Sequence, residues 1–336
     1  MERRNRGSAL IVVLWALFIL GALALAINSF VWPQLDLANR LKVRLKTHYL
    51  ARAAIKRAML EAAIDNTEEY DAPGDSWACN EKAFKEIPLG DDGTFSLEYK
   101  ILPADGNGEE AGYGMTDEER KININTAPFE VLKGLFEIVA GASPNDAEDI
   151  AHCVMDWRDE NDEPEKNGAE EDYYEYLEPA YRCKNGDFET LEELLLVKGV
   201  TKEIFDKVKD RTTIYGSGSV NINTADEAVL RCLGLSEDAA AKVVHFRQGP
   251  DRMEGTKDDG VFTDPNNITA ALAQKESMSG EETSKITHAI SQGWLGICSE
   301  NLRGTAVGRL SGKPLAGRVT FVFNRKDNII AYWREE

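Results

Sequence analysis

The segment from Asp156 to Tyr174 concentrates carboxylate and amide side chains, the oxygen donors that hard cations prefer. Four of them recur at positions 1, 3, 5 and 12 of an EF-hand-like spacing: Asp159, Asn161, Glu163 and Glu170. In an EF-hand, oxygens at these positions wrap one calcium ion. Pro164 occupies the position that needs glycine for the sharp turn, so the segment is not an EF-hand proper. Two interpretations stay open, a calcium-binding loop and a solvated acidic loop.

A second acidic turn lies between Gly249 and Gly260. It offers three carboxylates on a stretch with few apolar residues to fix it: Asp251, Asp258 and Asp259. A calcium ion bound by these carboxylates would order the turn, which has too few apolar residues to be fixed by packing. We consider it a second candidate calcium site, with an ordinary Gly/Asp turn as the alternative.

Catalytic motifs do not accompany these acidic segments. The sequence has no GxSxG elbow, no GxxxxGK[ST] phosphate loop and no HExxH motif, and its four histidines are far apart. His152 and Cys153 are neighbours, but adjacent residues of a helix point to different faces. We therefore expect a non-enzymatic protein.

The elements that position the acidic segments begin with an uncharged run from Ser8 to Ile27. As a helix it is about 30 Å long, enough to cross a bilayer core. The arginines that precede it favour a cytoplasmic N-terminus, and no later apolar run of spanning length returns the chain. The processing signal, Gly7 followed by Ser8, stands before the run, whereas a signal peptide places it after. We expect cleavage at Gly7 to leave the apolar helix on the mature protein.

The charge is divided unevenly along the chain. Residues 1–57 carry a net charge of +8. Because the whole chain carries −19, the remaining residues carry −27. An acidic exported body repels polyanions such as DNA and attracts divalent cations.

Five cysteines show no zinc-like spacing: Cys79, Cys153, Cys183, Cys232 and Cys298. An exported domain meets an oxidising compartment. We expect a disulfide between Cys153 and Cys183, which flank the acidic segment and would staple its two ends. Closing a loop of this size contributes about 3 kcal/mol in the chain-entropy model.

The remaining pattern predicts a long helix, a small sheet and a helical insertion. Helical periodicity continues from Ile27 to about Ile64, with Pro33 expected to kink or briefly melt it. Alternation predicts a strand over 94–101, followed by a Gly-rich linker over 105–114. The next strand pattern begins at about residue 305. The roughly 180 residues between the two strand regions have the pattern of short helices. We predict an α+β fold, a pilin-like long N-terminal helix with a small antiparallel sheet and a large inserted all-α domain.

A six-residue phrase occurs twice in the insertion, as Ile122–Ala127 and as Val220–Ala225, each followed by an apolar helix. Thr224 and Glu227 have the spacing of a capping box at the second helix. The phrase resembles the opening of helix-hairpin-helix repeats, and 195–202 resembles the turn of such a hairpin. A signal-anchored, extracytoplasmic nucleic-acid-binding protein is therefore the alternative function, although the acidic body argues against it.

The leader resembles a prepilin leader, which a membrane peptidase cuts after glycine before methylating the new N-terminus. Most pilin-like subunits carry glutamate at the fifth mature position, which here is Val12. This departure, the insertion, both repeats and the Asp-Trp acidic loop together resemble the minor pseudopilin GspK of the type II secretion system. The resemblance spans nearly the whole chain.

The resemblance implies a subunit at the pseudopilus tip that supports protein export with the minor pseudopilins GspI and GspJ. It also implies bound calcium in the first acidic loop, a single-pass inner-membrane anchor, a periplasmic body and no nucleic-acid partner. The predicted organisation is a leader (1–7), a transmembrane helix (8–27), its continuation (28–65), a first sheet part (66–117), the inserted α-domain (118–300) and the C-terminal strands (301–336).

Overall fold

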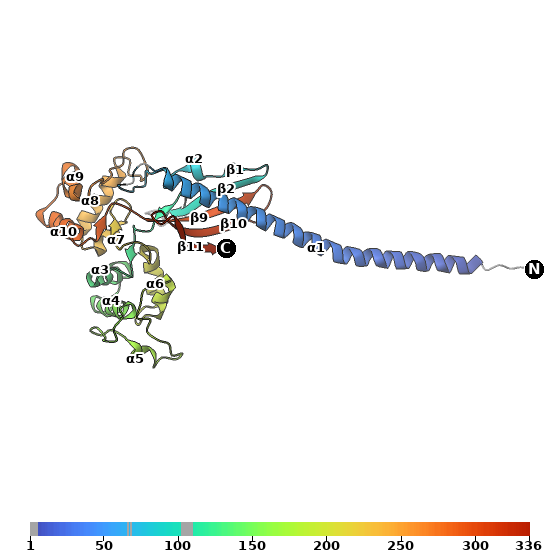
Figure 1. The fold of residues 1–336 in the computed structure, drawn as a ribbon, viewed down its shortest axis with the longest axis horizontal. Coiled ribbons are helices and arrows are strands. Elements are labelled where there is room, and N and C mark those ends of the chain that lie inside the picture. The colour runs from blue at the N-terminus through green and yellow to red at the C-terminus, as the bar shows by residue number, and fades with distance from the viewer. Residues whose placement is uncertain (1–5, 66, 68, 102–109) are drawn as a thin grey trace, which may run out of the picture.

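The structure is a computed structural model of the 336-residue chain and describes residues 6–65, 67, 69–101 and 110–336. Residues 1–5 of the predicted leader and 105–109 of the predicted Gly-rich linker lie outside these residues, and 110–113 of that linker form a strand instead. Figure 1 shows a long helix at one end, a small sheet along its second half and a helical domain at the far end of the body. The predicted α+β fold class is confirmed.

Helix α1 runs from Arg6 to Ala63 without interruption. Gly7 and Ser8 lie in its first turn, and Pro33 lies inside it. The expected local melting at Pro33 does not occur, because a proline removes only one backbone hydrogen bond and the surrounding apolar residues continue the helix. The large apolar side chains between Leu10 and Leu45 are mostly exposed, so no other element among the described residues packs against the first half of α1.

The sheet is antiparallel and has the strand order β1-β2-β9-β10-β11, with β3 on β2 and β4 on β9. Its strands are β1 (Ile87–Leu89), β2 (Gly93–Ile101), β3 (Glu110–Tyr113), β4 (Thr116–Asp117), β9 (Asn301–Leu310), β10 (Gly317–Asn324) and β11 (Ile329–Glu335). A short helix, α2 (Glu81–Phe84), precedes β1. The central pair, β2 and β9, joins segments on either side of the insertion, so the sheet closes only after the helical domain has been traversed.

The second half of α1 packs on this sheet through small residues. Ala51, Ala54 and Ala58 are fully buried and recur at helical spacing, which lets the helix approach the strands closely. Gly308 in β9 completes the fit, since a Cβ there would lie 2.1 Å from the Thr47 carbonyl oxygen. The close approach of helix and sheet therefore requires glycine at this position.

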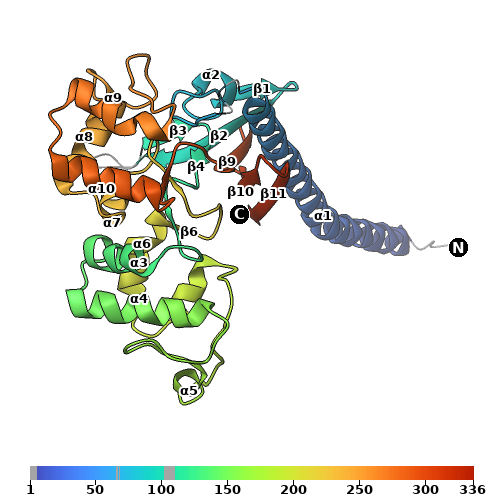
Figure 2. The same ribbon diagram turned by 60° about the vertical axis from the view of Figure 1, so that its left-hand side comes forward.

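The helical domain between β4 and β9 contains two lobes, which Figure 2 separates. The first has β5 (Ile122–Asn123), α3 (Phe129–Gly134) with a π-helical turn (Leu135–Val139), α4 (Pro144–Arg158), α5 (Glu171–Tyr174), a 3₁₀ turn (Leu191–Leu196), α6 (Lys202–Val208), a second 3₁₀ turn (Lys209–Arg211) and β6 (Thr212–Thr213). The second has β7 (Val220–Asn221), α7 (Glu227–Cys232), α8 (Glu237–Gln248), a 3₁₀ turn (Pro265–Asn267), α9 (Ile268–Lys275), α10 (Gly280–Ser291) and β8 (Leu295–Gly296). One continuous apolar core joins both lobes, separate from the core between α1 and the sheet.

The two lobes are built on the same plan. In each, the repeated phrase supplies a short strand, two helices follow, and a later strand closes the lobe by pairing parallel to the first. Asn125 brackets the backbone of Phe188 with two hydrogen bonds, and Asn223 brackets Phe262 in the same way. The repeat thus marks a duplicated structural unit, in which the asparagines bind backbone as part of the packing.

An arginine completes each unit. Arg158, the last residue of α4, donates to the carbonyl oxygens of Ile124 and Ala127. Arg247, near the end of α8, donates to the carbonyl oxygens of Ile222 and Ala225. These carbonyls belong to equivalent positions of the two phrases, so each arginine anchors the second helix of its unit to the phrase that begins the unit.

The expected capping box at Thr224 is wrong. Asp226 is the N-cap of α7, and its carboxylate accepts a hydrogen bond from the Val229 amide. Thr224 instead donates to Asp117, outside the lobe. A tertiary contact thus takes the hydroxyl that local spacing assigned to the helix start.

Candidate metal centre

The first acidic loop begins where α4 ends and closes at the start of α5. Its carboxylates of Asp156, Asp159 and Glu170 each place an oxygen within 4.8 Å of the others. Asp156 comes from the last turn of α4, whereas Glu170 is the N-cap residue of α5. The loop therefore folds back so that both of its ends contribute to one cluster.

Glu170 is the least satisfied member of this cluster. Its side chain is buried, and neither carboxylate oxygen has a hydrogen-bond partner among the described residues. Burial, and then the charges of Asp156 and Asp159, raise the pKa of Glu170 to about 7. A buried carboxylate with free lone pairs beside two further acids offers oxygen donors of the kind that a hard cation prefers.

Asp156 holds the loop in this shape. One of its oxygens accepts a hydrogen bond from the Glu165 amide at 3.0 Å, and the other accepts one from the Ala169 amide at 2.6 Å. The loop passes so close that a Cβ on Gly168 would lie 1.9 Å from Asp156 Oδ2. Glycine at position 168 is thus a condition of the cluster's geometry.

The structure brings together two of the four residues expected from EF-hand spacing. Asp159 and Glu170 belong to the cluster. Asn161 lies against Asp159, but its amide nitrogen donates to that carboxylate and its oxygen accepts from the Glu163 amide. Glu163 itself is exposed and lies outside the cluster. Pro164 prevents the EF-hand turn, so Asp156, upstream of the counted spacing, takes the place that Glu163 was expected to fill.

The second acidic loop follows α8 and gathers the three residues expected there. Asp251, Asp258 and Asp259 place carboxylate oxygens within 4.8 Å of one another. Unlike the first cluster it is mostly exposed, and backbone amides and Thr256 bond several of the oxygens. Within its lobe it lies where the first loop lies, after the second helix and before the bracketed phenylalanine.

The expected disulfide between Cys153 and Cys183 is not formed. Both cysteines are buried free thiols. The Cys153 sulfur faces the Asn167 carbonyl oxygen, and the Cys183 sulfur faces the Asp156 carbonyl oxygen. The two thiols thus face opposite ends of the acidic segment, which the hydrogen bonds of Asp156 already hold together.

The hairpin turn that suggested nucleic-acid binding uses its basic residues internally. Lys198 donates to the carbonyl oxygens of Asn167 and Gly168, in the first acidic loop. Lys202, in the first turn of α6, forms an ion pair with Asp206. These lysines are engaged within the lobe, which argues against a phosphate-binding surface.

The chain is similar to several proteins of one family. Residues 113–217 match the family model described as type II secretion system protein K. The type II secretion system protein K of Pseudomonas aeruginosa is 24% identical over 89% of this chain and 85% of its own length. That of Pectobacterium carotovorum is 25% identical over 75% of this chain and 77% of its own length.

A comparison of folds points to the same proteins. A chain in the crystal structure of the GspK-GspI-GspJ complex from enterotoxigenic Escherichia coli matches with a TM-score of 0.64 and 14% identity. The match covers 89% of this chain and 99% of that one. Sequence and fold are thus both similar to those of type II secretion system protein K.

These similarities support a minor pseudopilin of the type II secretion system and favour that function over the nucleic-acid alternative. Among the described residues, α1 is the one helix long and apolar enough to cross a membrane, and it lies near the N-terminus as an inner-membrane anchor of protein K would. The family is a structural part of the secretion apparatus, in accord with the lack of catalytic motifs in the sequence.

The raised pKa of Glu170 predicts a pH dependence of stability for the metal-free chain. Between its ordinary pKa of 4.5 and the folded value of about 7, the folded state binds more protons than the unfolded state. Its contribution to stability therefore falls as pH rises through this window. In chelator-treated protein, Glu170→Gln should flatten the decline in melting temperature between pH 5 and pH 8.

Glu163→Gln is the matched control, because it removes a carboxylate from the same loop but outside the cluster. It should retain the wild-type dependence on pH. Parallel declines for wild type and Glu170→Gln would show that Glu170 titrates normally.

Proposed function

We propose that this chain forms the tip of the type II pseudopilus, as a non-enzymatic subunit that assembles with proteins of the GspI and GspJ types. The observation that carries the proposal is the position of the helical domain. It lies at the end of the body opposite the free half of α1, where the next subunit of a growing filament would stack (Figure 1).

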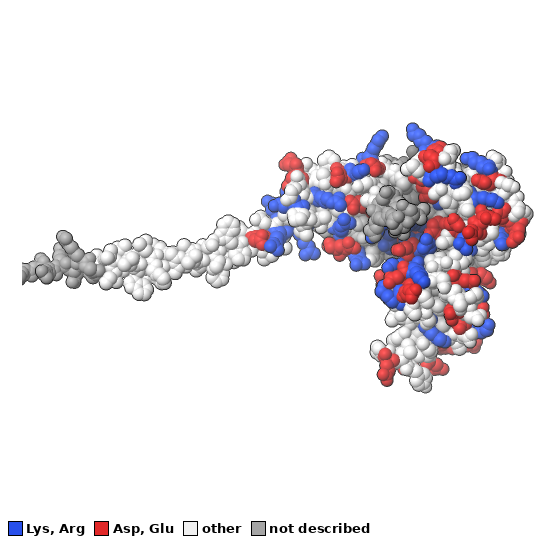
Figure 3. All heavy atoms as spheres, turned by 180° about the vertical axis from the view of Figure 1, so that it is seen from behind, with Lys and Arg blue, Asp and Glu red and all other residues white. Residues whose placement is uncertain are grey.

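The free half of α1 supports assembly through helices. Its apolar side chains are exposed, with Leu10 at 65% and Phe18 at 69%, and Figure 3 shows no charge along most of this half. Lipid covers such a surface before assembly, and apolar helices of partner subunits cover it in a filament. Val12 leaves this surface without a carboxylate that could pair with a subunit above.

Two partner types are supported by the solved complex that this chain resembles. That complex contains GspK, GspI and GspJ, and almost the whole of its matched chain is covered. We propose that proteins of the GspI and GspJ types bind this chain along α1 and its sheet.

The tip position is tested by removing the helical domain. Its ends are adjacent, because β4 pairs with β9 at Asp117 and Leu302, so a short turn can replace residues 118–300. The intact chain should appear only at filament ends by immunogold labelling. The deletion variant should also enter the shaft, since no bulk obstructs the subunit above.

Val12→Glu in the intact chain is the control that separates steric obstruction from the missing carboxylate. Retained binding of the GspI- and GspJ-type partners will show that the deletion variant is folded. If that folded variant enters the shaft no more than the intact chain, the obstruction argument is wrong.

We propose further that the two acidic loops bind calcium. The first loop offers Asp156, Asp159 and Glu170, and both carboxylate oxygens of Glu170 are buried without a partner among the described residues. The second offers Asp251, Asp258 and Asp259 at the equivalent place of the duplicated unit. Each ion would neutralise carboxylates that otherwise repel one another and would order a loop with few apolar residues.

Calcium should therefore raise the melting temperature of the chelator-treated chain. An ion present at one hundred times its dissociation constant stabilises by about 2.7 kcal/mol per site. Glu170→Gln and Asp258→Asn should each remove one equivalent of bound calcium in equilibrium dialysis, whereas Glu163→Gln should remove none. No melting shift at millimolar calcium would contradict both sites.

We also propose that a prepilin peptidase cleaves after Gly7 and that Ser8 is then methylated, with the body in the periplasm. Support comes from the order of the basic residues, the small residues and the apolar run. Intact mass and N-terminal sequencing should find a form beginning at Ser8 only when the peptidase is coexpressed. An unprocessed N-terminus in both cultures would identify a plain signal anchor.

A further inference from the structure

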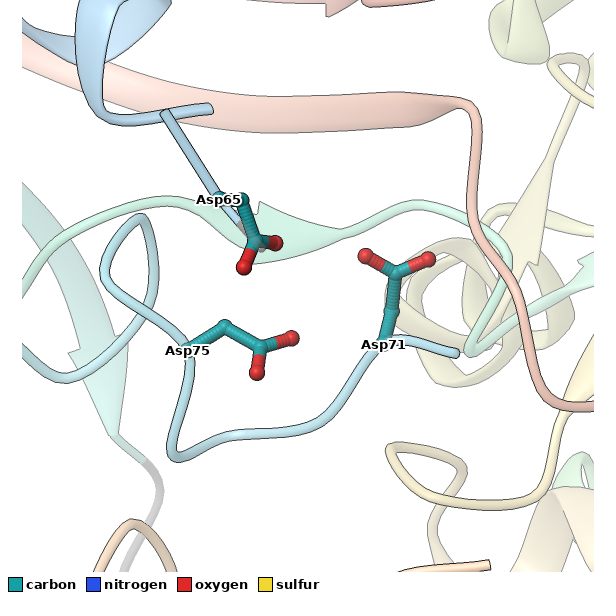
Figure 4. Close-up of side chains that lie close together, drawn as sticks. All are labelled: Asp65, Asp71 and Asp75. Atoms are coloured by element: carbon teal, nitrogen blue, oxygen red, sulfur yellow. The ribbon is translucent and has the colours of Figure 1, made fainter. Parts of the chain in front are cut away.

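A third group of acids lies outside the helical domain, where the chain leaves α1. Asp65 follows the end of that helix, and Asp71 and Asp75 lie in the loop that leads to α2. Each places a carboxylate oxygen within 4.8 Å of the others. Figure 4 shows the three carboxylates turned toward one another from different parts of the loop.

Asp71 is the central member of this group. Its side chain is fully buried, and one oxygen, Oδ2, accepts hydrogen bonds from the Ser299 amide and from Arg325 at 2.6 and 2.7 Å. The other oxygen, Oδ1, is buried without a partner among the described residues. An ionised carboxylate oxygen that has lost water and gained no donor is costly, so the site lacks a positive group at this point.

The charges within the cluster do not balance. Arg325 forms the ion pairs recorded for these carboxylates in the described part of the chain, with Asp71 and, at 3.7 Å, with Asp65. Three carboxylates and one guanidinium leave a net charge of −2. The Asp65 side chain is only 7% exposed, so water screens this excess poorly. One divalent cation would neutralise this excess.

We propose that Asp65, Asp71 and Asp75 bind one hard divalent cation of the calcium class. All three ligands are oxygens, which suit such ions better than zinc. An oxygen separation of up to 4.8 Å fits ligands on one ion at the Ca–O distance of about 2.4 Å. The proposal does not depend on calcium in the helical domain.

An ion here would fasten three parts of the molecule together. The Asp71 amide donates to the Ile297 carbonyl oxygen, and its carbonyl oxygen accepts from Asn221 of the second repeat. Arg325 comes from the turn between β10 and β11. The site therefore joins the end of α1 to the sheet and to the helical domain.

Trp77 makes the site detectable. Its indole nitrogen donates to Asp65 Oδ2 at 3.1 Å, so an ion bound by Asp65 lies within a few ångströms of this ring. Terbium occupies oxygen sites of the calcium type, and a nearby excited indole sensitises its emission. The experiment uses the full chain in detergent micelles, treated with chelator, in a Glu170→Gln and Asp258→Asn background that weakens both helical-domain sites.

This background should still bind one equivalent of terbium with emission excited through tryptophan, and calcium should displace it. Asp75→Asn should remove that equivalent and its emission. Asparagine can still accept the bond that the Ala72 amide donates to this side chain, so the loop should remain folded. Asp91→Asn, which removes an exposed carboxylate elsewhere on the body, should change neither quantity.

Trp77→Phe gives an independent test of the ion's position if Asp75→Asn proves unstable. It should leave the number of bound ions unchanged and reduce the sensitised emission. Undiminished emission from Trp77→Phe would place the ion elsewhere. No bound terbium in the background variant would show that Arg325 and a proton alone balance the cluster, and the proposal would be wrong.

Discussion

Three consecutive buried acids at the entrance to the insertion, Asp117, Glu118 and Glu119, hold the helical domain on the sheet. Asp117 accepts side-chain hydrogen bonds from three residues: Asn221, Thr224 and Ser299. Burial opposes ionisation of Glu118, but Lys121 and Arg303 outweigh it and hold its pKa at about 2. Each acid thus ties the insertion to a strand or to the second repeat, and the position of the whole domain depends on these contacts.

The duplicated unit explains why the acidic loops lie where they do. In each lobe an asparagine fixes the backbone beyond the loop, and an arginine fixes the helix before it. The loop between these two anchors needs no apolar core to hold its ends. It can therefore be built from carboxylates, because the anchors keep its ends in place despite their mutual repulsion and a bound cation would relieve that repulsion.

The sequence predicted the long helix, the strands and the insertion because each depends on local periodicity. Asp159, Glu170 and the three acids of the second loop could also be predicted, since carboxylates close in sequence tend to be close in space. Asp156 was missed because counting began at Asp159, although the Asp-Trp motif includes it. The group around Asp71 could not be predicted, because only tertiary folding buries Asp71 and brings Arg325 from 254 residues away. Tertiary contacts likewise overrode the capping role of Thr224 and separated the sulfurs of Cys153 and Cys183.

Helix α1 has a mechanical consequence. Its 58 residues span about 87 Å as one rod, and the same helix is both the apolar anchor and a layer of the folded body. Because α1 continues from one to the other, a load applied to the folded body passes directly into the membrane or the filament core. Pro33 is the point of least stiffness along this path, because one backbone hydrogen bond is missing there. Bending under load would therefore concentrate outside the folded body, and the body would keep its shape.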